Sequence, residues 1–274
     1  MTRTVSMVCL VAGLQGACSK PAPAPDAPSA APDAVEAEKA GASPTLPAPE
    51  ASGLASADRI AADGGDLVVQ PIQHGSLLLS FGDQHIFVDP WSSGPLPSEP
   101  KADLILITDI HGDHLDPAGV DRVKDDETVI VGPPAVAEQL PGTLALRNGE
   151  AQEFGGVRVV AVPMYNLPRP EQAELRHPPG RGNGYVLTLG GKRVYVSGDT
   201  ACTPEMKALK DIDVAFVCMN MPYTMPPEEA AECVAAFKPR VVYPYHFRGS
   251  DLTQFEQPLA AVPGVDVRIR RWYP

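Results

Sequence analysis

Aspartate and histidine residues occur at or just beyond the ends of three apolar stretches of this 274-residue chain. The stretches Leu104–Thr108, Arg193–Ser197 and Val241–Tyr245 are rich in β-branched and aromatic residues, which is typical of strands. The polar residues that follow them are Asp109, His111, Asp113, His114, Asp199 and His246. Ligands of α/β proteins gather at the carboxyl ends of strands, and imidazole and carboxylate groups bind divalent transition metals. The pattern therefore predicts a metal centre at one sheet edge.

The elements that must position these residues can be read from hydrophobic patterning and turn residues. The predicted strands are Leu67–Ile72, Leu77–Phe81, His85–Val88, Leu104–Thr108, Thr128–Val131, Val157–Val162, Tyr185–Leu189, Arg193–Ser197, Val214–Cys218 and Val241–Tyr245, and Trp272-Tyr273 is expected to form a C-terminal strand. The predicted helices are Pro117–Val123, Ala135–Leu140, Pro204–Lys210, Pro227–Phe237 and Leu252–Ala261. Early hairpins followed by strands that alternate with helices favour an α/β sandwich over a single doubly wound sheet.

The phrases around the polar residues resemble a known family. His111-Gly112-Asp113-His114 matches the end of the H-x-H-x-D-H motif of the metallo-β-lactamase superfamily. Gly198-Asp199-Thr200 resembles its bridging-aspartate motif and His246 its final metal histidine, while Gln73–Ser76 and Val88–Pro90 are similar to the opening hairpins of the branch that includes ascorbate-6-phosphate lactonase. The resemblance runs from about residue 68 to 250 and implies a four-layered αβ/βα sandwich with metals at one edge.

The resemblance also implies two metal positions that share one aspartate. The residues expected to form the second position are all present, and they are Asp113, His114, Asp199 and His246. The first position is altered. Asp109 stands where the family has its first histidine, and Met164-Tyr165-Asn166 stands where we expect the middle histidine, so only His111 and Asp199 are unchanged.

Three interpretations of this departure stay open. Asp109 can itself bind, with the Asn166 amide oxygen or water completing the shell; one metal can be lost, leaving a mononuclear site; or the fold can have lost catalysis altogether. The expected cofactor is Zn²⁺, as one or two ions. A carboxylate in place of an imidazole hardens the site, so Mn²⁺ or Fe²⁺ are alternatives.

The function that this resemblance implies is hydrolysis of a small ester, lactone, amide or phosphodiester. A metal lowers the pKa of bound water toward about 7, and the resulting hydroxide attacks a carbonyl or phosphoryl centre. Asp113 is expected to orient the nucleophile or relay its proton, and His74 is expected near the site, although a structural histidine at a strand edge is an equal alternative. The competing function is a non-catalytic metal- or ligand-binding lipoprotein that retains the fold.

Several further residues are candidates for substrate binding. The Gly/Pro-rich segment around His177 and Arg181 has the composition of a loop that can close over substrate, with Arg181 meeting an anion. Tyr223 and Arg248 follow predicted strands, and Arg248 can hold an acidic group. Asn166 is placed at the same site by the resemblance. The simpler interpretations are a plain connecting loop and surface side chains.

The cysteines leave one pairing open. Cys218 and Cys233 could form a disulfide in an oxidising compartment, but their spacing cannot decide it. Cys202 is expected to be an inert cysteine near the start of a helix.

The N-terminal residues have the pattern of an export signal. Arg3 precedes the apolar run Val5–Leu14, and Gly16 and Ala17 lead into Cys18, which resembles a lipobox that ends in a lipid-modified cysteine. An ordinary cleaved signal is the alternative. We expect residues 1–18 to be the signal, 19–63 a disordered tether and 64–274 the folded domain, because residues 19–50 hold eight prolines, ten alanines and no aromatic residue.

The net charge of the chain limits the kinds of partner that we expect. The formal net charge is -12, and an acidic surface repels phosphate backbones, so we expect a small-molecule substrate and no nucleic acid. Membrane contact is expected only through a lipid at Cys18, on the periplasmic face of a bacterial membrane. Without lipidation the protein would be periplasmic or secreted. The sequence does not determine an oligomeric state.

Overall fold

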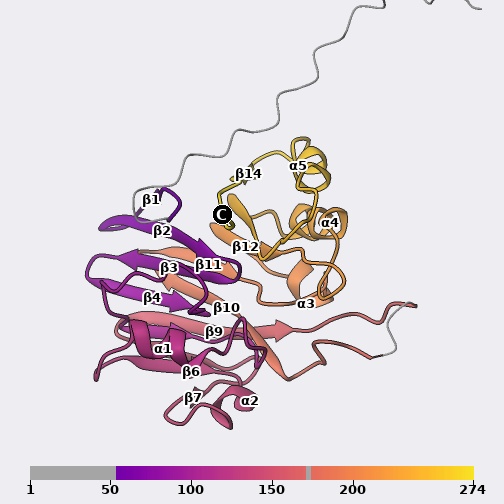
Figure 1. The fold of residues 1–274 in the computed structure, drawn as a ribbon. Coiled ribbons are helices and arrows are strands. Elements are labelled where there is room, and N and C mark those ends of the chain that lie inside the picture. Colours follow the sequence, from indigo (N-terminus) through magenta and orange to yellow (C-terminus); the bar gives the residue numbers. More distant parts are fainter. Residues whose placement is uncertain (1–53, 171–173) are drawn as a thin grey trace, which may run out of the picture. The chain divides into compact units, whose positions relative to one another are not determined.

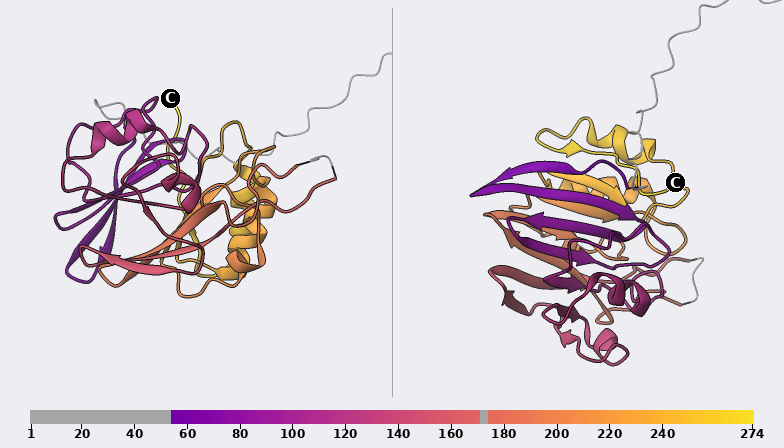
Figure 2. Two further views of the ribbon diagram at one scale, coloured as in Figure 1. Left: turned by 90° about the horizontal axis from the view of Figure 1, so that it is seen from below. Right: turned by 60° about the vertical axis from the view of Figure 1, so that its left-hand side comes forward.

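The computed structural model describes residues 54–170 and 174–274, and all of these residues belong to one compact unit. Within that part of the chain, two seven-stranded β-sheets face each other, and helices lie on their outer sides (Figure 1 and Figure 2). This arrangement is the four-layered αβ/βα sandwich that the sequence predicted, so the α/β fold class is confirmed.

The two sheets repeat one topology. The first sheet contains, in spatial order, β1 (Asp58–Ala62), β2 (Gly65–Gln73), β3 (Ser76–Phe81), β4 (Gln84–Val88), β5 (Leu104–Leu106), β6 (Val129–Gly132) and β7 (Leu144–Ala145). The second contains, from its other edge, β8 (Ala151–Phe154), β9 (Val157–Met164), β10 (Gly182–Leu189), β11 (Lys192–Val196), β12 (Val214–Cys218), β13 (Val241–Tyr245) and β14 (Asp266–Val267). In each sheet the first four strands pair antiparallel and the next three pair parallel. The parallel strands of each sheet therefore direct several loops to one edge.

The helices divide between the sheets. The helices are α1 (Pro117–Val123), α2 (Pro134–Ala137), α3 (Pro204–Lys207), α4 (Pro227–Phe237) and α5 (Thr253–Leu259). α1 and α2 bury apolar residues in a small core against the first sheet, whereas α3 to α5 pack on the second sheet (Figure 2). Strand β3 shows how one sheet serves two cores, because Leu77 and Leu79 face the second sheet and Leu78 faces the helices.

The chain departs from the predicted elements in several places. Asp58–Ala62 was expected to lie in the tether, but it forms β1 because it pairs with β2 and because Asp58 binds Arg270 and the Tyr243 hydroxyl. The tether boundary at residue 63 is therefore wrong. Trp272-Tyr273 is not a strand, although the Trp272 ring is buried in the core. Helix α2 ends earlier than predicted, before Pro141, which disfavours helix in the residue preceding it.

The predicted signal peptide, Cys18 and the tether as far as residue 53 lie outside the described residues. Among residues 54–170 and 174–274, none of the helices has the length and apolar character that a bilayer span requires.

A disulfide joins Cys202 and Cys233, whose Cα atoms are 5.5 Å apart. The pairing of Cys218 with Cys233, which the sequence left open, does not form. Cys202 precedes α3 and Cys233 lies on the buried face of α4, and these two helices are in contact. Cys218 is buried on β12 and donates to the Thr200 carbonyl. Burial raises the pKa of its thiol to about 12, so it is an unreactive core residue.

Candidate metal centre

The predicted ligands meet at the edge of the sandwich, as their strand-end positions indicated. His74 lies in the turn after β2, and the segment 109–114 follows β5. Asp199 follows β11, and His246 follows β13. His177 reaches the same place from the loop between β9 and β10. These five loops bring together three groups of side chains whose ligand atoms lie close enough to hold a metal ion.

Three of the residues at this edge adopt a left-handed backbone. The φ angle is 58° at His74, 44° at Asp89 and 48° at His246. A non-glycine residue pays a conformational cost in this region, and such residues cluster at functional sites. Gly75 lets the turn come close, because a Cβ there would lie 3.3 Å from His246 and 3.5 Å from His114.

The second metal position has the composition that the sequence predicted. His114 Nε2 lies 3.4 Å from Asp199 Oδ2 and 3.9 Å from Asp113 Oδ1. His246 Nε2 lies 3.5 Å from Asp199 Oδ1 and 3.4 Å from Asp113 Oδ2. Two imidazole nitrogens thus face two carboxylates around one point.

The buried atoms at this point lack hydrogen-bond partners. His114 Nε2, His246 Nε2 and Asp199 Oδ1 are all buried, and none of them has a hydrogen bond within the described residues. Leaving a buried polar atom unpaired costs about 1–3 kcal/mol, so three at one point call for a common partner. Two imidazoles and a carboxylate are the donors that a divalent transition metal binds, and the residues therefore fit such an ion.

Asp89 orients His114 toward this point. Its Oδ2 accepts from His114 Nδ1 at 2.7 Å, while Thr108 donates to Asp89 through its amide and its hydroxyl. With its proton on Nδ1, His114 presents the Nε2 lone pair to the metal position, as metal-binding histidines held by a carboxylate do. The sequence reasoning gave Asp89 no role, although the resemblance in Val88-Asp89-Pro90 was a signal that could have found it.

The first metal position is completed by a residue that the sequence reasoning assigned elsewhere. His111 Nδ1 lies 2.9 Å from Asp109 Oδ2 and 3.1 Å from His177 Nε2. His177 Nε2 lies 3.4 Å from Asp199 Oδ2 and 3.8 Å from Asp109 Oδ2. His177 therefore stands where the middle histidine was missing, and Asp199 Oδ2 lies 3.4 Å from a histidine of each position, His177 in the first and His114 in the second.

Asn166 holds His177 and does not face the metal position. Its Oδ1 accepts from the His177 backbone amide at 3.1 Å and lies 3.0 Å from His177 Nδ1. The expectations that the Asn166 oxygen completes the metal shell or contacts substrate are therefore wrong. The physical reason is that the loop folds back, so that His177 comes between Asn166 and the cleft.

Arg181 is bound to Asp109 and is not free for a substrate anion. Its Nε and Nη2 atoms lie 3.0 and 2.9 Å from the two carboxylate oxygens of Asp109. The Asp109 side chain is fully buried, so this forked pair compensates a charge that would otherwise be unpaired. The predicted role of Arg181 in anion binding is corrected to support of Asp109.

The carboxylates of the site are ionised at neutral pH. Burial favours the neutral acid, but neighbouring histidines outweigh it and hold the pKa values of Asp113 and Asp199 far below their usual range. Burial also opposes ionisation of Asp109, yet the His111 hydrogen bond, His114, His177 and Arg181 lower its pKa to about 2. Three anionic groups in one pocket attract a cation.

Burial and the nearby carboxylates also shift the pKa values of the histidines. Burial lowers the pKa of His177 to about 4, and burial also lowers the pKa of His74, so both rings are neutral at pH 7. Burial alone would also lower the pKa of His114, but the nearby carboxylates of Asp199 and Asp89 outweigh burial and raise this pKa well above its usual value. A divalent ion would take the place of that proton.

An open cleft of about 270 Å³ gives access to these groups. The residues that line it are His74, His111, Asp113, Arg176, His177, Asp199, Asn220, Tyr223, His246 and Arg248. Tyr223 and Arg248 line this cleft, whereas Asn166 and Arg181 do not. The sequence reasoning missed Arg176, whose guanidinium lies 5.2 Å from the centre of the Tyr223 ring.

The fold and the site define an αβ/βα sandwich protein with a histidine and aspartate cluster at the sheet edge. A family model described as the beta-lactamase superfamily domain matches residues 69–246. The chain therefore belongs to the metallo-β-lactamase superfamily.

Similar proteins from other organisms cover most of the folded part. A UPF0173 metal-dependent hydrolase of Thermococcus onnurineus is 35% identical over 181 residues, which cover 61% of this chain and 78% of the relative. A crystal structure from Parabacteroides distasonis, of a protein named as a metal-dependent hydrolase, is 40% identical with a TM-score of 0.74 and covers 79% of this chain and 98% of that one. The metallo hydrolase Igni18 of Ignicoccus hospitalis, at 21% identity and a TM-score of 0.61, covers 75% of this chain and 95% of that one and shows the fold alone.

Proposed function

We propose that this protein is a metal-dependent hydrolase that cleaves a small ester, lactone, amide or phosphodiester. The observation that carries the proposal is the pair of ligand sets that share Asp199, with buried and unpaired nitrogens on His114 and His246 aimed at one of them. The names of the relatives support the same reaction class.

Two ions of Zn²⁺ are the proposed cofactor, with Mn²⁺ or Fe²⁺ as alternatives. Asp109, His111, His177 and Asp199 would hold one ion. Asp113, His114, Asp199 and His246 would hold the other. When bound, such ions supply Lewis-acid polarisation of the scissile bond and activation of water at neutral pH. His177 supports two ions over one, because it restores an imidazole to the altered first position.

Asp113 and His74 are the residues proposed to act beside the metals. The Asp113 side chain is one-third exposed to the cleft, and its Oδ2 accepts from His74 Nε2 at 3.0 Å. Its depressed pKa keeps it ionised, so it can accept a hydrogen bond from a nucleophile and orient it. Asp199 is almost fully buried and serves only as a ligand in this proposal.

The mouth of the cleft favours a substrate with an anionic group. Arg176 and Arg248 are both exposed there, and within the described residues neither guanidinium pairs with a carboxylate. In a chain of net charge -12, two free cations at the mouth would offset the repulsion of an anion. A carboxylate or phosphate on the substrate, away from the scissile bond, is the group they would bind.

Export to an oxidising compartment, with a lipid on Cys18, is part of the proposal. The Cys202–Cys233 disulfide supports it, because structural disulfides persist outside the reducing cytosol. The acidic surface favours a small-molecule substrate over nucleic acid.

The test is metal analysis of the purified full chain together with a panel of esters, lactones and phosphodiesters. We expect bound transition metal, hydrolysis that chelation abolishes and zinc restores, and loss of about 10²-fold or more in rate for Asp199→Asn. Arg176→Ala and Arg248→Ala should raise KM for an acidic ester about tenfold and leave a neutral ester unchanged, and Arg158→Ala is the control for an exposed arginine outside the cleft. Bound metal without turnover of any panel member would favour the non-catalytic binding protein.

A further inference from the structure

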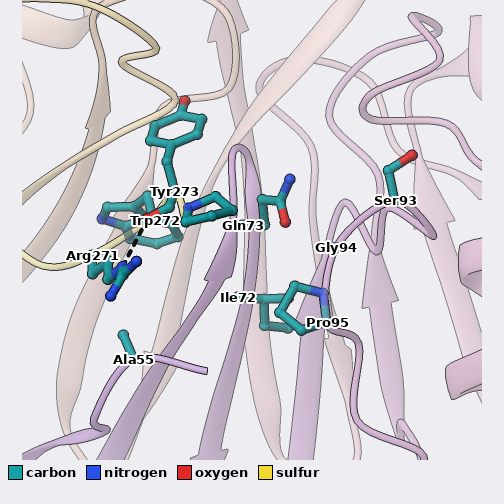
Figure 3. A pocket seen from close by; sticks show the side chains of 10 residues that line it. Ala55, Ile72, Gln73, Ser93, Gly94, Pro95, Arg271, Trp272 and Tyr273 are labelled. Atoms are coloured by element: carbon teal, nitrogen blue, oxygen red, sulfur yellow. Dashed lines mark hydrogen bonds between the residues drawn. The ribbon is translucent and has the colours of Figure 1, made fainter. Parts of the chain in front are cut away.

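The C-terminal residues pack directly against the turn that carries His74. The Trp272 carbonyl accepts from the His74 backbone amide at 3.3 Å, and the Trp272 ring packs edge-on against Tyr245 and Phe216. Figure 3 shows Trp272 and Tyr273 lying next to Gln73, the residue that precedes His74. The position of His74 therefore depends on residues that are about 200 positions away in the chain.

The Tyr273 hydroxyl joins this tail to the cleft. It lies 2.8 Å from His74 Nδ1 and accepts from the Arg248 backbone amide at 2.9 Å. The other nitrogen of the same ring, His74 Nε2, lies 3.0 Å from Asp113 Oδ2. One unbroken row of hydrogen bonds thus runs from the loop after β13, through the tail, to a carboxylate in the cleft.

Only one arrangement of protons on a neutral His74 ring satisfies every contact in this row. A carboxylate oxygen accepts hydrogen bonds, so in the 3.0 Å contact with Asp113 Oδ2 the proton is carried by His74 Nε2. His74 Nδ1 is then an acceptor. The Tyr273 hydroxyl already accepts from Arg248, and its own proton is free to be donated to Nδ1. The opposite tautomer would place a lone pair of His74 against the Asp113 carboxylate.

We propose that Tyr273 is a positioning residue, whose hydroxyl fixes the orientation of the His74 ring and thereby of the Asp113 carboxylate in the cleft. Asp113 gains a donor of defined direction, which restricts it to one orientation. Residues 271–273 would then help to position a side chain of the cleft, although only the Tyr273 hydroxyl among them hydrogen-bonds to the His74 ring. This inference rests on the proposed function in one respect, namely that the enzyme uses Asp113 in hydrolysis.

The first experiment reads the tautomer directly in metal-free full-length protein at pH 7.5. Nitrogen-15 NMR of the ring nitrogens is practical because the chain has only six histidines, and the His74→Gln variant assigns the resonances. We expect one tautomer of His74, protonated at Nε2. The Tyr273→Phe variant keeps the aromatic ring and loses the hydroxyl, so the Nδ1 resonance of His74 should move toward that of an imidazole nitrogen that accepts no hydrogen bond. An Nδ1 resonance of His74 that does not move in Tyr273→Phe would overturn the proposal.

The control is Tyr243→Phe, which removes a hydroxyl bound to Asp58 away from the cleft and should leave His74 unchanged. A second measurement is zinc affinity by chelator competition, since loss of a residue that orients a ligand costs about tenfold or more. Tyr273→Phe should lose this factor and Tyr243→Phe should not. Equal affinities of the wild-type and Tyr273→Phe proteins would count against the proposal. Because neither measurement involves turnover, failure of the hydrolase proposal would leave this test valid.

Discussion

Nε2 of His177 lies 3.4 Å from Oδ2 of Asp199, although the two residues belong to different loops. This contact gives the first metal position a second imidazole beside His111. It also explains how the site can tolerate Asp109 where its superfamily has histidine. Asp109 is paired with Arg181, so its negative charge is already largely balanced within the protein.

Replacing His177 should remove one of the two metal ions. In the His177→Ala variant the first position keeps only Asp109, His111 and the shared Asp199, so we expect the zinc content to fall from two ions to about one per chain. Elemental analysis after dialysis measures it. His85→Ala is the matched control, because His85 binds Ser80 on the first sheet and lines no part of the cleft. Two retained ions in His177→Ala would contradict the assignment.

Asp89 should matter for metal binding although it does not touch the metal. In Asp89→Asn the amide can no longer supply the negative charge that fixes the tautomer of His114. Zinc affinity should drop by about 10- to 100-fold. Competition with a fluorescent chelator measures the change, and an unchanged affinity would contradict the role of Asp89 in orienting His114.

The pairing of Asp109 predicts a pH dependence of stability in the metal-free protein. Its pKa falls from 3.8 to about 2 on folding, so the folded state favours the ionised form. Such a group contributes stability above the unfolded pKa and loses it as pH falls through the folded one. The contribution is about 2 kcal/mol.

The measurement compares urea unfolding of wild type and Asp109→Asn between pH 2 and 6. The difference in unfolding free energy should be constant above about pH 5 and should shrink by about 2 kcal/mol as pH falls toward 2. A difference that does not change with pH would contradict the depressed pKa.

The disulfide between Cys202 and Cys233 should stabilise the fold appreciably. It closes a loop with a sequence separation of 31, for which chain entropy gives about 3–4 kcal/mol. Reduction should therefore lower the unfolding free energy by up to that amount in urea titrations. Cys218→Ala serves as the control, because it removes the one free thiol among residues 54–170 and 174–274 and should leave the effect of reductant intact.

Much of this site follows from local sequence. His111, Asp113 and His114 follow a buried strand, which places them at a sheet edge, and Asp199 and His246 follow strands in the same way. To predict these positions, it is enough to recognise the strands and to know that ligands gather at their carboxyl ends. The alternation of strands and helices favoured an α/β sandwich, and the resemblance to the superfamily implied its four layers.

What sequence reasoning missed depends on how loops fold back across long distances. Whether His177 or Asn166 faces the cleft is decided by the path of the loop between β9 and β10, and Arg181 turns toward Asp109 only in that path. The partner of Cys233 likewise depends on the packing of α3 on α4. Tyr273 reaches His74 from the far end of the chain, so no local pattern could reveal it.

The central claim is that two metal positions share Asp199. The most direct measurement is a crystal structure of the zinc-loaded protein with anomalous data collected at the zinc edge. We predict two anomalous peaks on either side of the Asp199 carboxylate, one beside His111 and His177 and the other beside His114 and His246. A single peak beside His114 and His246 would contradict the shared arrangement, and no peak at Asp199 would contradict the metal centre itself.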